Sequence, residues 1–586
     1  MKNGQVARAL RDIGFLTEAE DEDNAQFKSR AYYRAADSID ALEQDVSGVY
    51  EKGGTDALLE IPGIGKAIAA KVEEYLKSGR IKHLDELKAK IPIDIGQLSS
   101  IEGIGPKTLR AIYQKLGVTD MAGLENAARE GRLKTVPGIT ARKEQDILKK
   151  IEFAKKSGGR RIIGEVWPLA KKIEARLKGL EGTRVLHAAL AGSARRMKET
   201  IGDLDYIVCA SEPEKVMDFF VKMPEVEQVK SRGPAKVFVR LADGIDCDLL
   251  AVPKESWGSA LLYFTGSKEH NVELRRIAIA RGLRLNEWGV FAAGENNINN
   301  NNSEQRQVAG ASEEDVYKAL GLAWIAPEMR ENAGEIKLAA KDRLPNLVEY
   351  GSLKGDLQVH SDNSDGTATI EEMALAAKEF GLDYIAITDH TKSLAMAGGM
   401  DEQELLDQAH KIAELNDRLN GIRVLASAEV NIGKDGTLDI ANNVLDRLDV
   451  VGAAIHSHFG LPVEEQTARL VGAAENPSID IIFHPTGRLI NRRQGYTVDI
   501  DRLTDVARDT GTALEIDAHY NRLDLKDEYA RMAVRKGVKL TIDSDAHHPV
   551  HYAYLQFGIG QARRGWATAK DILNTMPADG LLKALK

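Results

Sequence analysis

After residue 340, short apolar runs alternate with helical patterns, and this alternation constrains the fold more than any other feature of the chain. Residues 384–388, 479–483 and 538–542 are strand-like, and amphipathic segments lie between them. Strands that alternate with helices favour parallel pairing, because each helix returns the chain to the same end of the sheet. We therefore expect a parallel α/β barrel or a related layered fold in this region.

Metal-seeking side chains follow these apolar runs. Ten of the thirteen histidines lie after residue 350, although this region is under half of the chain. Parallel strands bring such positions together at one face of a barrel. Mixed histidine and carboxylate ligands suit Zn²⁺, Mn²⁺ or Fe, and a metal cluster can activate water for attack on a phosphoester. The candidates at strand ends are His360, His390, Glu429, His456, His484, Asp545 and His547.

Length and composition bound the remaining possibilities. A chain of 586 residues exceeds one hydrophobic core, so several domains are expected. No apolar run is long enough to span a bilayer, and the first residues are too charged for a signal peptide. Cys209 and Cys247 are the only cysteines, which excludes a disulfide framework and a thiolate-rich zinc module. We expect a cytoplasmic protein without a membrane partner.

Residues 1–160 read as short amphipathic helices joined by glycine-containing turns. Ile61-Pro-Gly-Ile-Gly65 and Ile101-Glu-Gly-Ile-Gly105 share a helix-hairpin-helix pattern, and a weaker copy, Val136-Pro-Gly-Ile139, has Thr140 in place of the second glycine. Paired glycines let the backbone turn tightly and point N–H groups toward a phosphate oxygen. The two full copies predict sequence-independent DNA binding through Gly63, Gly65, Lys66, Gly103, Gly105 and Lys107, and the third turn is expected to be structural.

Charge is unevenly distributed along the chain. The formal net charge is −10, but residues 1–290 carry roughly +5 and the remainder roughly −15. Residues 51–200 alone carry roughly +11, which suits a phosphate backbone. A helical region with solvated lysines is the alternative. The polar, Asn-rich tract 294–303 cannot bury a core and predicts a mobile loop or linker.

Residues 161–290 alternate helix-like and strand-like segments, which indicates a mixed α/β domain. Asp203 and Asp205 lie two residues apart on a predicted strand, so both carboxylates point to one face. Such a pair can hold two divalent ions for phosphoryl transfer. Asp246 and Asp248 share a face of another strand, and spacing alone does not choose which of them is the third carboxylate.

A candidate phosphate-binding turn precedes these aspartates. Gly192 and Ser193 offer close backbone access and a hydroxyl donor, while Arg195 and Arg196 offer bidentate contacts to phosphate. A plain turn followed by a solvated acidic strand is the alternative, but the parts occur together in an order that the chemistry can use.

Gly192-Ser-Ala-Arg-Arg196 with Gly202-Asp203-Leu-Asp205 resembles the palm of family X DNA polymerases, and Tyr263-Phe-Thr-Gly-Ser-Lys-Glu-His-Asn271-Val-Glu-Leu-Arg275 resembles their thumb. With the hairpins, the resemblance covers residues 1–290. It implies that Asp203, Asp205 and Asp248 hold Mg²⁺ or Mn²⁺, because the family aligns its third aspartate with Asp248-Leu-x-x-Val-Pro.

The resemblance also implies the nucleotide contacts. Ser193 and Arg196 are expected to hold the triphosphate, Tyr263 and Phe264 to lie beside the incoming sugar, Asn271 at its base edge and Arg275 on the template strand. The full nucleotide-binding set is Gly192, Ser193, Arg196, Gly202, Tyr263, Phe264, Gly266, Asn271 and Arg275.

Some relatives remove the deoxyribose phosphate at a damaged site through a lysine Schiff base on the first hairpin helix. Lys71 aligns with that nucleophile, which must be partly neutral to attack. Ala67 replaces the expected phosphate-steering lysine, so a phosphate-binding surface lysine is the alternative.

The motifs after residue 340 resemble the polymerase and histidinol phosphatase (PHP) domain of bacterial family X polymerases, over about residues 340–575. The resemblance implies 3′-to-5′ exonuclease or abasic-site phosphodiesterase activity, typically with Mn²⁺. This chain departs from the family pattern at three positions: it has Gln358 where the family has His, Asp517 where it has Asn, and Asn431 where it has Asp. Glutamine is a poor ligand for a transition metal. The implied ligands are His360, Asp365, His390, Glu429, His456, His484, Asp545 and His547.

Other polar residues of this region receive lesser roles. Arg488 and Arg522 are candidate contacts to a substrate phosphate, with a salt bridge at the barrel rim as the alternative. Four further histidines are expected to support the ligands or to lie on the surface: His458, His519, His548 and His551.

We therefore predict a multidomain α and α/β chain that ends in a distorted (β/α) barrel. The expected parts are a helix-hairpin-helix, lyase-like domain at 1–85, a fingers-like helical domain at 86–160, a palm at 161–255, a thumb at 256–320, a linker at 321–345 and a PHP domain at 346–586.

The predicted function is gap-filling DNA repair synthesis on gapped or primer-template DNA, with deoxynucleoside triphosphates, by a monomeric cytoplasmic protein associated with the nucleoid. The metals are Mg²⁺ or Mn²⁺ in the palm and Mn²⁺, Zn²⁺ or Fe in the PHP domain. The alternatives are a structural, weakly active PHP domain, a chain that is mainly a nuclease, a template-independent nucleotidyltransferase, and a non-enzymatic scaffold at DNA ends.

Overall fold

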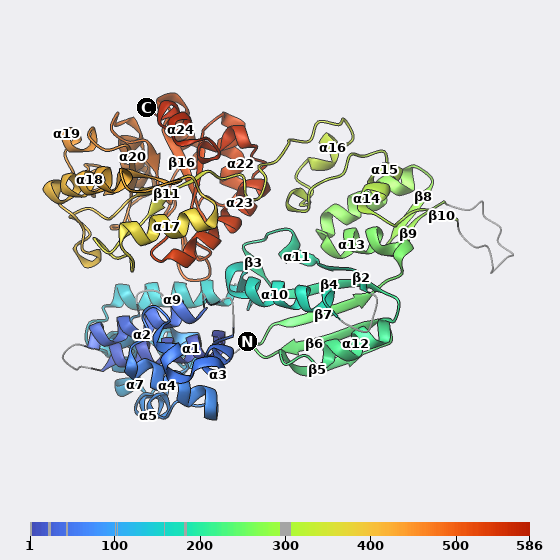
Figure 1. The fold of residues 1–586 in the computed structure, drawn as a ribbon, viewed down its shortest axis with the longest axis horizontal. Coiled ribbons are helices and arrows are strands. Elements are labelled where there is room, and N and C mark those ends of the chain that lie inside the picture. Colours follow the sequence, from blue (N-terminus) through green and yellow to red (C-terminus); the bar gives the residue numbers. More distant parts are fainter. Residues whose placement is uncertain are drawn as a thin grey trace. The chain divides into compact units, whose positions relative to one another are not determined.

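The computed structural model describes residues 3–585 except 21–24, 41, 43–44, 100, 102–103, 157–158, 181–184 and 293–305. The chain divides into two compact units, residues 1–158 with 491–494, and residues 159–490 with 495–586 (Figure 1). The tract 294–303 therefore lies outside the described residues, as do Glu102 and Gly103 of the second hairpin. Within the described ranges, no helix is long and apolar enough to cross a membrane.

The first unit is helical and is built around one hydrophobic core. Apolar residues recur on the inner faces of the helices, and those of the first and last helices, such as Leu10 and Ile151, belong to the same cluster. The helices are α1 (Asn3–Ala19), α2 (Ala25–Asp40), α3 (Val46–Leu59), α4 (Lys66–Ser78), α5 (Lys82–Lys90), α6 (Ile95–Leu98), α7 (Pro106–Leu116), α8 (Met121–Arg129) and α9 (Ala141–Lys156).

The predicted hairpin turns each begin a helix of this unit. Gly65 is the N-cap of α4 and Gly105 is the N-cap of α7. Gly63 has a φ of 78°, a conformation that favours glycine. In the third copy, the Thr140 hydroxyl accepts the N–H of Lys143 at 3.2 Å. Threonine therefore begins α9 by a side-chain cap where glycine begins α4 and α7, in keeping with a structural turn.

The second unit begins with a five-stranded sheet of order β2-β4-β7-β6-β5. Strands β4 and β7 are parallel neighbours, and α10 and α12 pack on the sheet. The elements are β1 (Arg161–Ile162), α10 (Ile163–Lys178), β2 (Val185–Leu190), α11 (Gly192–Arg195), β3 (Thr200–Ile201), β4 (Asp203–Ala210), α12 (Pro213–Val221), β5 (Val226–Arg232), β6 (Lys236–Leu241) and β7 (Asp246–Ala251).

A smaller lobe follows this sheet. It contains α13 (Trp257–Thr265), α14 (Lys268–Ala280), α15 (Glu313–Ala319), α16 (Glu335–Ala339) and the antiparallel strands β8 (Leu283–Asn286), β9 (Gly289–Ala292) and β10 (Gln307–Ala309). Residues 321–345, which we expected to form a linker, instead supply buried Leu322, Ile325, Met329 and Ile336 to the core of this lobe. Most of the segment is neither helix nor strand, so its apolar residues show no regular spacing in the sequence.

The last part of the chain is a nearly closed barrel of seven parallel strands in sequence order. The N–H of His360 donates to the Ala546 carbonyl at 2.8 Å, so the first strand meets the segment after the last one. The predicted parallel α/β barrel is thereby confirmed. The strands are β11 (Gly355–Val359), β12 (Tyr384–Ile387), β13 (Arg423–Asn431), β14 (Val450–Ala454), β15 (Ile481–Ile482), β16 (Ala513–Asp517) and β17 (Leu540–Asp543).

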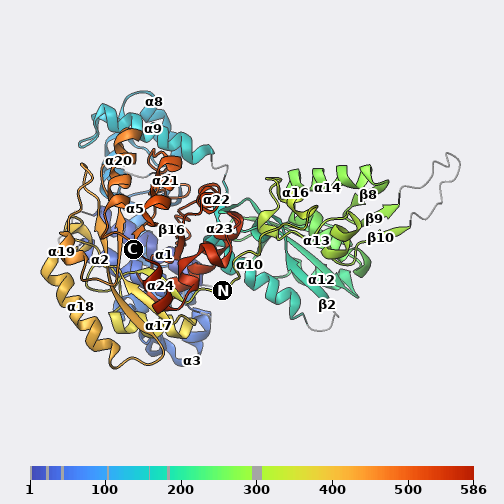
Figure 2. The ribbon, with the colours of Figure 1, turned by 90° about the horizontal axis from the view of Figure 1, so that it is seen from above.

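Helices surround these strands (Figure 2). Their buried faces complete a core of residues such as Met373, Leu470 and Leu503 against the outward side chains of the strands. The helices are α17 (Ile370–Phe380), α18 (Glu402–Asn416), α19 (Asn442–Leu445), α20 (Val463–Glu475), α21 (Ile500–Thr510), α22 (Asp527–Lys536), α23 (Leu555–Arg564) and α24 (Ala578–Ala584).

Candidate active sites

Three carboxylates meet on the strands β4 and β7. The parallel register sets Asp205 opposite Asp248, and Asp203 opposite Asp246. Asp246 forms ion pairs with two cations, at 2.7 and 2.8 Å. By contrast, Oδ1 of Asp248 is buried and accepts no hydrogen bond from the described residues. The geometry therefore favours Asp248 over Asp246 as the third carboxylate, a choice that spacing alone could not make.

The protein balances only part of the charge of this triad, through Lys236, which lies 3.6 Å from Oδ2 of Asp248. Burial, followed by the charges of Asp203 and Asp248, raises the pKa of Asp205 to about 7. Burial also raises the pKa of the Asp248 carboxyl, although Lys236 opposes it. Carboxylates that repel one another in this way attract divalent cations, and carboxylate oxygens are ligands that Mg²⁺ and Mn²⁺ prefer. The residues present therefore fit the ions that the sequence predicts.

The turn before the triad is shaped around Asp205. Gly192 has a φ of 61°, and a Cβ there would lie 2.2 Å from Oδ2 of Asp205. The N–H of Ala191 donates to the Asp205 carbonyl at 2.7 Å. The hydroxyl of Ser193 is buried without a hydrogen-bond partner in the described part of the chain. Glycine is thus required by a close approach, and a donor remains available beside the carboxylates.

The two arginines of this turn differ in what they bind. Arg195 makes a bidentate pair with Glu313 at 2.8 and 2.9 Å and also donates to the Thr265 hydroxyl. Arg196 donates through Nε to Glu331 at 3.1 Å and through Nη1 to the Thr265 carbonyl. Arg195 therefore links α11 to the smaller lobe, and its contact with phosphate stays a prediction.

Glu313 also binds a second arginine, which the sequence did not single out. Arg330 is fully buried, and its guanidinium donates to both carboxylate oxygens of Glu313 at 2.7 and 3.0 Å. These cations hold the pKa of Glu313 well below its usual range despite burial. No motif indicates this pair, because Glu313 and Arg330 meet only when residues 321–330 fold back on α15.

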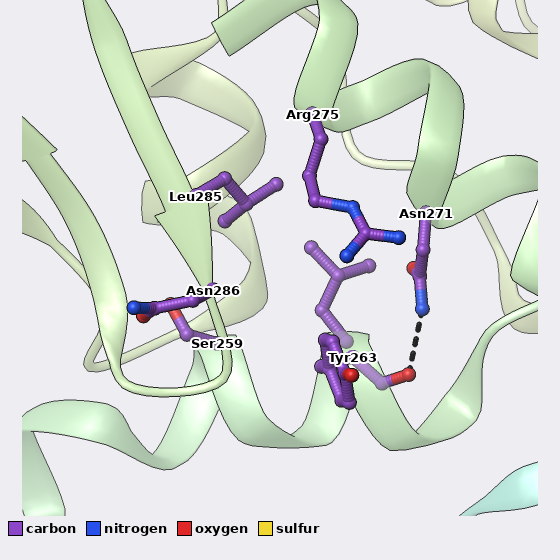
Figure 3. Close-up of a pocket in the computed structure, with 7 residues that line it drawn as sticks. Ser259, Tyr263, Asn271, Arg275, Leu285 and Asn286 are labelled. Carbon is purple, nitrogen blue, oxygen red and sulfur yellow. Dashed lines mark hydrogen bonds between the residues drawn. The ribbon is translucent and has the colours of Figure 1, made fainter. Parts of the chain in front are cut away.

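A pocket in the smaller lobe gathers three predicted nucleotide contacts (Figure 3). Tyr263, Asn271 and Arg275 line it together with Ser259, Leu262, Leu285 and Asn286. The Asn271 amide donates to the Tyr263 carbonyl at 2.7 Å.

Three more of the predicted nucleotide-binding residues pack against aromatic or arginine side chains. The Phe264 ring meets the Tyr263 ring edge-on, with centroids 5.3 Å apart. A Cβ on Gly266 would lie 3.1 Å from Arg196 Nη1, and one on Gly202 would lie 3.0 Å from Arg160 Nη1.

All eight metal ligands expected in the barrel converge at its carboxyl face. Asp365 lies 3.5 Å from His390 and 3.3 Å from His547. Glu429 faces four imidazoles: His390 at 2.9 Å, His484 at 2.8 Å, His456 at 3.2 Å and His360 at 3.6 Å. Asp545 lies 3.3 Å from His360 and 3.6 Å from His547. Two groups of ligand atoms are each close enough to hold one ion: His360, Asp365, His390 and His547, and His390, Glu429 and His456.

Unsatisfied polar atoms show that this ring fits metal ions. Both ring nitrogens of His360, Nδ1 of His390 and Oε2 of Glu429 are buried and form no hydrogen bond of good geometry with described residues, although each lies within 4 Å of another ligand atom, as Nδ1 of His390 and Oε2 of Glu429 do at 2.9 Å. Buried polar atoms of this kind are costly unless a cation or another partner satisfies them. Burial would lower the pKa of His390, but Glu429 and Asp365 raise it to about 11. Metal ions would replace the protons that the ring otherwise attracts.

Two departures from the family pattern contact the ring directly. Gln358 is buried and donates through Nε2 to Glu429 at 3.2 Å. Its amide therefore lies beside that carboxylate, as the ligand imidazoles do. Asn431 lies 3.2 Å from Nδ1 of His456, and this contact orients Nε2 toward Glu429. Asn431 therefore supports a ligand, whereas Gln358 donates to the ligand Glu429 at the position where the family pattern has a histidine.

The two candidate phosphate arginines of the barrel are held in ion pairs. Arg522 lies 3.2 Å from Asp517 and 3.3 Å from Asp545, so it neutralises a ligand carboxylate. Arg488 binds Glu199, beside β3, at 2.8 Å, and also donates to a backbone carbonyl. The salt-bridge interpretation describes both residues. Among the extra histidines, His551 accepts the N–H of the ligand His547 at 3.2 Å, whereas His458 is exposed.

The predicted DNA-binding and lyase residues lie in the helical unit. Lys66 and Lys107 are exposed in the first turns of α4 and α7. Lys71 is half-buried on α4, where its ammonium donates to the Ala67 carbonyl at 3.4 Å and lies 5.8 Å from the Tyr32 ring centroid.

We expect Gln358→His to tighten metal binding at the barrel. The change would replace an amide, a weak ligand for Mn²⁺, by an imidazole that faces Glu429, and the affinity of the weakest site should rise about tenfold. Calorimetric titration of metal-free protein with Mn²⁺ would measure this rise. An unchanged affinity would show that residue 358 does not occupy a ligand position.

Family models match four parts of the chain. They are a helix-hairpin-helix domain at residues 1–81, a SAM-like helix-hairpin-helix tandem at 95–152, a DNA polymerase beta thumb at 260–331 and a PHP domain at 356–581. A hairpin-bearing polymerase with a beta-type thumb and a PHP barrel is the class of protein that this fold and these sites define.

Curated relatives extend the match to the whole chain. The DNA polymerase/3′-5′ exonuclease PolX of Bacillus subtilis is 36% identical over 98% of this chain and 97% of its own length. A probable phosphatase of Thermoanaerobacter sp. is 28% identical over 38% of this chain and 89% of its own. DNA polymerase lambda of Rattus norvegicus is 24% identical over 54% of each chain. The chain belongs to the bacterial family X DNA polymerases that carry a carboxy-terminal PHP domain.

Proposed function

We propose that this DNA polymerase fills short gaps during DNA repair and trims 3′ ends with its PHP centre. The observation that carries the proposal is the presence, in one compact unit, of two separate clusters of metal-seeking side chains. One cluster is a carboxylate triad beside a hydroxyl and an arginine, and the other is a ring of histidines and carboxylates. The first suits nucleotidyl transfer and the second suits phosphoester hydrolysis.

In the palm, Asp203, Asp205 and Asp248 are proposed to hold two Mg²⁺ or Mn²⁺ ions, which would neutralise the charge that develops at the transferred phosphate. Ser193 and Arg196 bind the triphosphate. The primer 3′-hydroxyl attacks the α-phosphate in line, and pyrophosphate leaves. The buried, unpartnered Ser193 hydroxyl and the unbalanced carboxylates support these roles.

The remaining nucleotide contacts are proposed for the pocket of the smaller lobe. Tyr263 and Phe264 lie beside the sugar, Asn271 at the base edge and Arg275 on the template strand. Gly266 and Gly192 admit the close approach of neighbouring groups that a side chain would block. The pocket lining supports this assignment.

In the barrel, the eight ligands are proposed to hold Mn²⁺, with Zn²⁺ or Fe as alternatives. Bound ions would supply an activated water for hydrolysis of the terminal phosphodiester. Glu429 binds between imidazoles, Asn431 orients His456, and Arg522 neutralises Asp545. The buried, unsatisfied ligand atoms support an active centre over a purely structural barrel.

One gel assay tests the proposed function. An end-labelled primer in gapped DNA, incubated with Mn²⁺, should be extended when deoxynucleotides are present and shortened when they are omitted. Extension without shortening would favour a structural PHP domain. Shortening without extension would make the chain mainly a nuclease, and extension that ignores the template would identify a template-independent transferase.

Binding through the hairpins should depend on Lys66 and Lys107. We expect the double substitution Lys66→Gln with Lys107→Gln to weaken binding of gapped DNA and to reduce the slope of log K against log salt by about 1 to 2, because each lysine neutralises one phosphate. Fluorescence anisotropy over a series of salt concentrations would measure the slope. Lys82→Gln, an exposed lysine on α5, is the matched control. An unchanged slope in the double variant would contradict phosphate contacts at the hairpins.

A further inference from the structure

Arg564 of the barrel contacts the palm and the smaller lobe at once. It lies at the end of α23, and its side chain is only 3% exposed. Nη1 donates to the Arg196 carbonyl at 3.0 Å and to the Glu331 carboxylate at 2.9 Å. Asp527 on α22 holds the rest of the guanidinium, with bonds of 2.9 Å from Nε and 2.6 Å from Nη2. The guanidinium therefore has a fixed orientation.

Glu331 is the shared partner of two arginines. The same oxygen, Oε1, accepts from Arg196 Nε at 3.1 Å and from Arg564 Nη1 at 2.9 Å, and Lys198 lies 3.9 Å away. Burial opposes ionisation, but Arg564, Arg196 and Lys198 lower the pKa of Glu331 below its usual range. Glu331 is therefore a carboxylate beside the proposed triphosphate site, and its charge is neutralised by two domains.

The backbone around Arg196 also rests on the barrel. A Cβ on Gly560 of α23 would lie 2.9 Å from the side chain of Met197, so glycine permits a close approach there. The Trp167 ring meets the Phe557 ring edge-on, with centroids 6.0 Å apart. Because Arg196 is the C-cap of α11, the bond from Arg564 fixes the end of the turn that also carries Ser193.

We propose that Arg564 is a positioning residue for nucleotide incorporation, through which the PHP domain sets the affinity of the palm for the incoming triphosphate. It shares Glu331 with Arg196 and fixes the Arg196 carbonyl. Without Arg564, one cation fewer would balance Glu331, and its carboxylate would both repel the triphosphate and hold Arg196 more strongly. The inference rests on the proposed role of Arg196 as a triphosphate ligand.

The test is the steady-state KM for the incoming deoxynucleotide on gapped DNA, measured with the full-length chain. Arg564→Gln should raise this KM about fivefold to tenfold and change kcat less, because a charge-assisted bond beside the triphosphate is lost. Arg563→Gln is the matched control. Arg563 is adjacent on α23 and also binds the smaller lobe, but through Glu328 at 2.8 Å. The KM of the Arg563→Gln variant should stay near that of the wild type.

A second substitution distinguishes positioning from general damage. In Arg564→Gln with Glu331→Gln, the cation and the carboxylate are removed together, so the part of the KM increase that comes from the unbalanced carboxylate should disappear and the KM should fall below that of Arg564→Gln. A merely structural defect would not be relieved by the second change and would lower the melting temperature and kcat together. An unchanged KM in Arg564→Gln, or a double variant no better than the single one, would overturn the inference.

Two further variants separate the inference from the function on which it rests. Arg196→Gln should raise the KM for the deoxynucleotide. If it does not, the proposed role of Arg196 fails. If Arg196→Gln raises the KM and Arg564→Gln does not, only the link to the PHP domain fails. Should Arg564→Gln not fold, Arg564→Lys tests the same link, because it keeps the charge but loses the fork of bonds to Glu331, Asp527 and Arg196. Its KM should rise at least about twofold, and an unchanged KM would overturn the inference.

Discussion

Asp205→Asn is expected to lower the rate of nucleotide incorporation by at least about a thousandfold. Asp205 shares a face of β4 with Asp203 and lies opposite Asp248 on β7, and burial is the largest cause of its raised pKa. Asparagine has nearly the same shape, so the fold should persist, but a neutral amide is a poor ligand for Mg²⁺ and leaves the triad short of one charge. Single-turnover incorporation opposite a one-nucleotide gap would measure the loss.

The chain offers a matched control for this substitution. Asp246 lies on β7 two residues before Asp248, but it pairs with Lys230 and Arg240. Asp246→Asn should therefore keep incorporation within about tenfold of the wild type. If Asp246→Asn abolished incorporation while Asp248→Asn did not, the choice of Asp248 would be refuted. Shortening of the primer by the PHP centre should persist in Asp205→Asn, because the barrel supplies its own ligands.

Glu429→Gln is expected to reduce hydrolysis of the primer 3′ end by at least about a thousandfold and to release bound metal. Four imidazoles face the Glu429 carboxylate, which is almost fully buried at the end of β13. The amide retains the shape but not the charge that holds cations among neutral histidines. Elemental analysis of the purified protein gives the metal content independently of activity, and a gel assay gives the rate.

Glu402→Gln is the control for the PHP centre. Glu402 begins α18 in the same domain and binds Lys392 at the surface. Its neutralisation should change neither metal content nor hydrolysis. Primer extension in Glu429→Gln should equal that of the wild type, because the palm carboxylates lie on another sheet. Hydrolysis that survived Glu429→Gln with its metal content reduced would locate the nuclease activity elsewhere in the chain.

Local pattern was sufficient for the architecture and for most of the candidate ligands. Strand-like runs that alternate with helical segments predicted the barrel, because burial on both sides of parallel strands gives continuous apolar runs. Seven of the candidate ligands follow those runs directly, whereas Asp365 follows no such run and was implied only by the resemblance to the PHP domain. The pair Asp203 and Asp205 was readable for the same reason, since residues two apart on a strand share a face.

Sequence patterns could not predict the burial of segments without regular spacing, nor distinguish residues of one type that lie close together in the chain. Residues 321–345 lack a period, so their burial in the smaller lobe could not be foreseen. Asp246 and Asp248 have the same spacing, and in the structure they differ because Asp246 has two close cations, whereas Asp248 has one at 3.6 Å and a buried oxygen with no hydrogen bond from the described residues. Arg195 and Arg196 are adjacent in sequence, yet one braces Glu313 and the other shares Glu331 with the barrel.

The sequence by itself determined the barrel, the hairpin turns and the two sets of metal-seeking residues, because each depends on the spacing of neighbours along the chain. Only the tertiary structure showed that Asp246 is paired with two cations, that Arg195 binds Glu313, and that Arg564 contacts the Arg196 carbonyl from the PHP domain. Arg196 and Arg564 are 368 residues apart. A bond of that kind is made by packing between domains, and no local pattern of side chains encodes it.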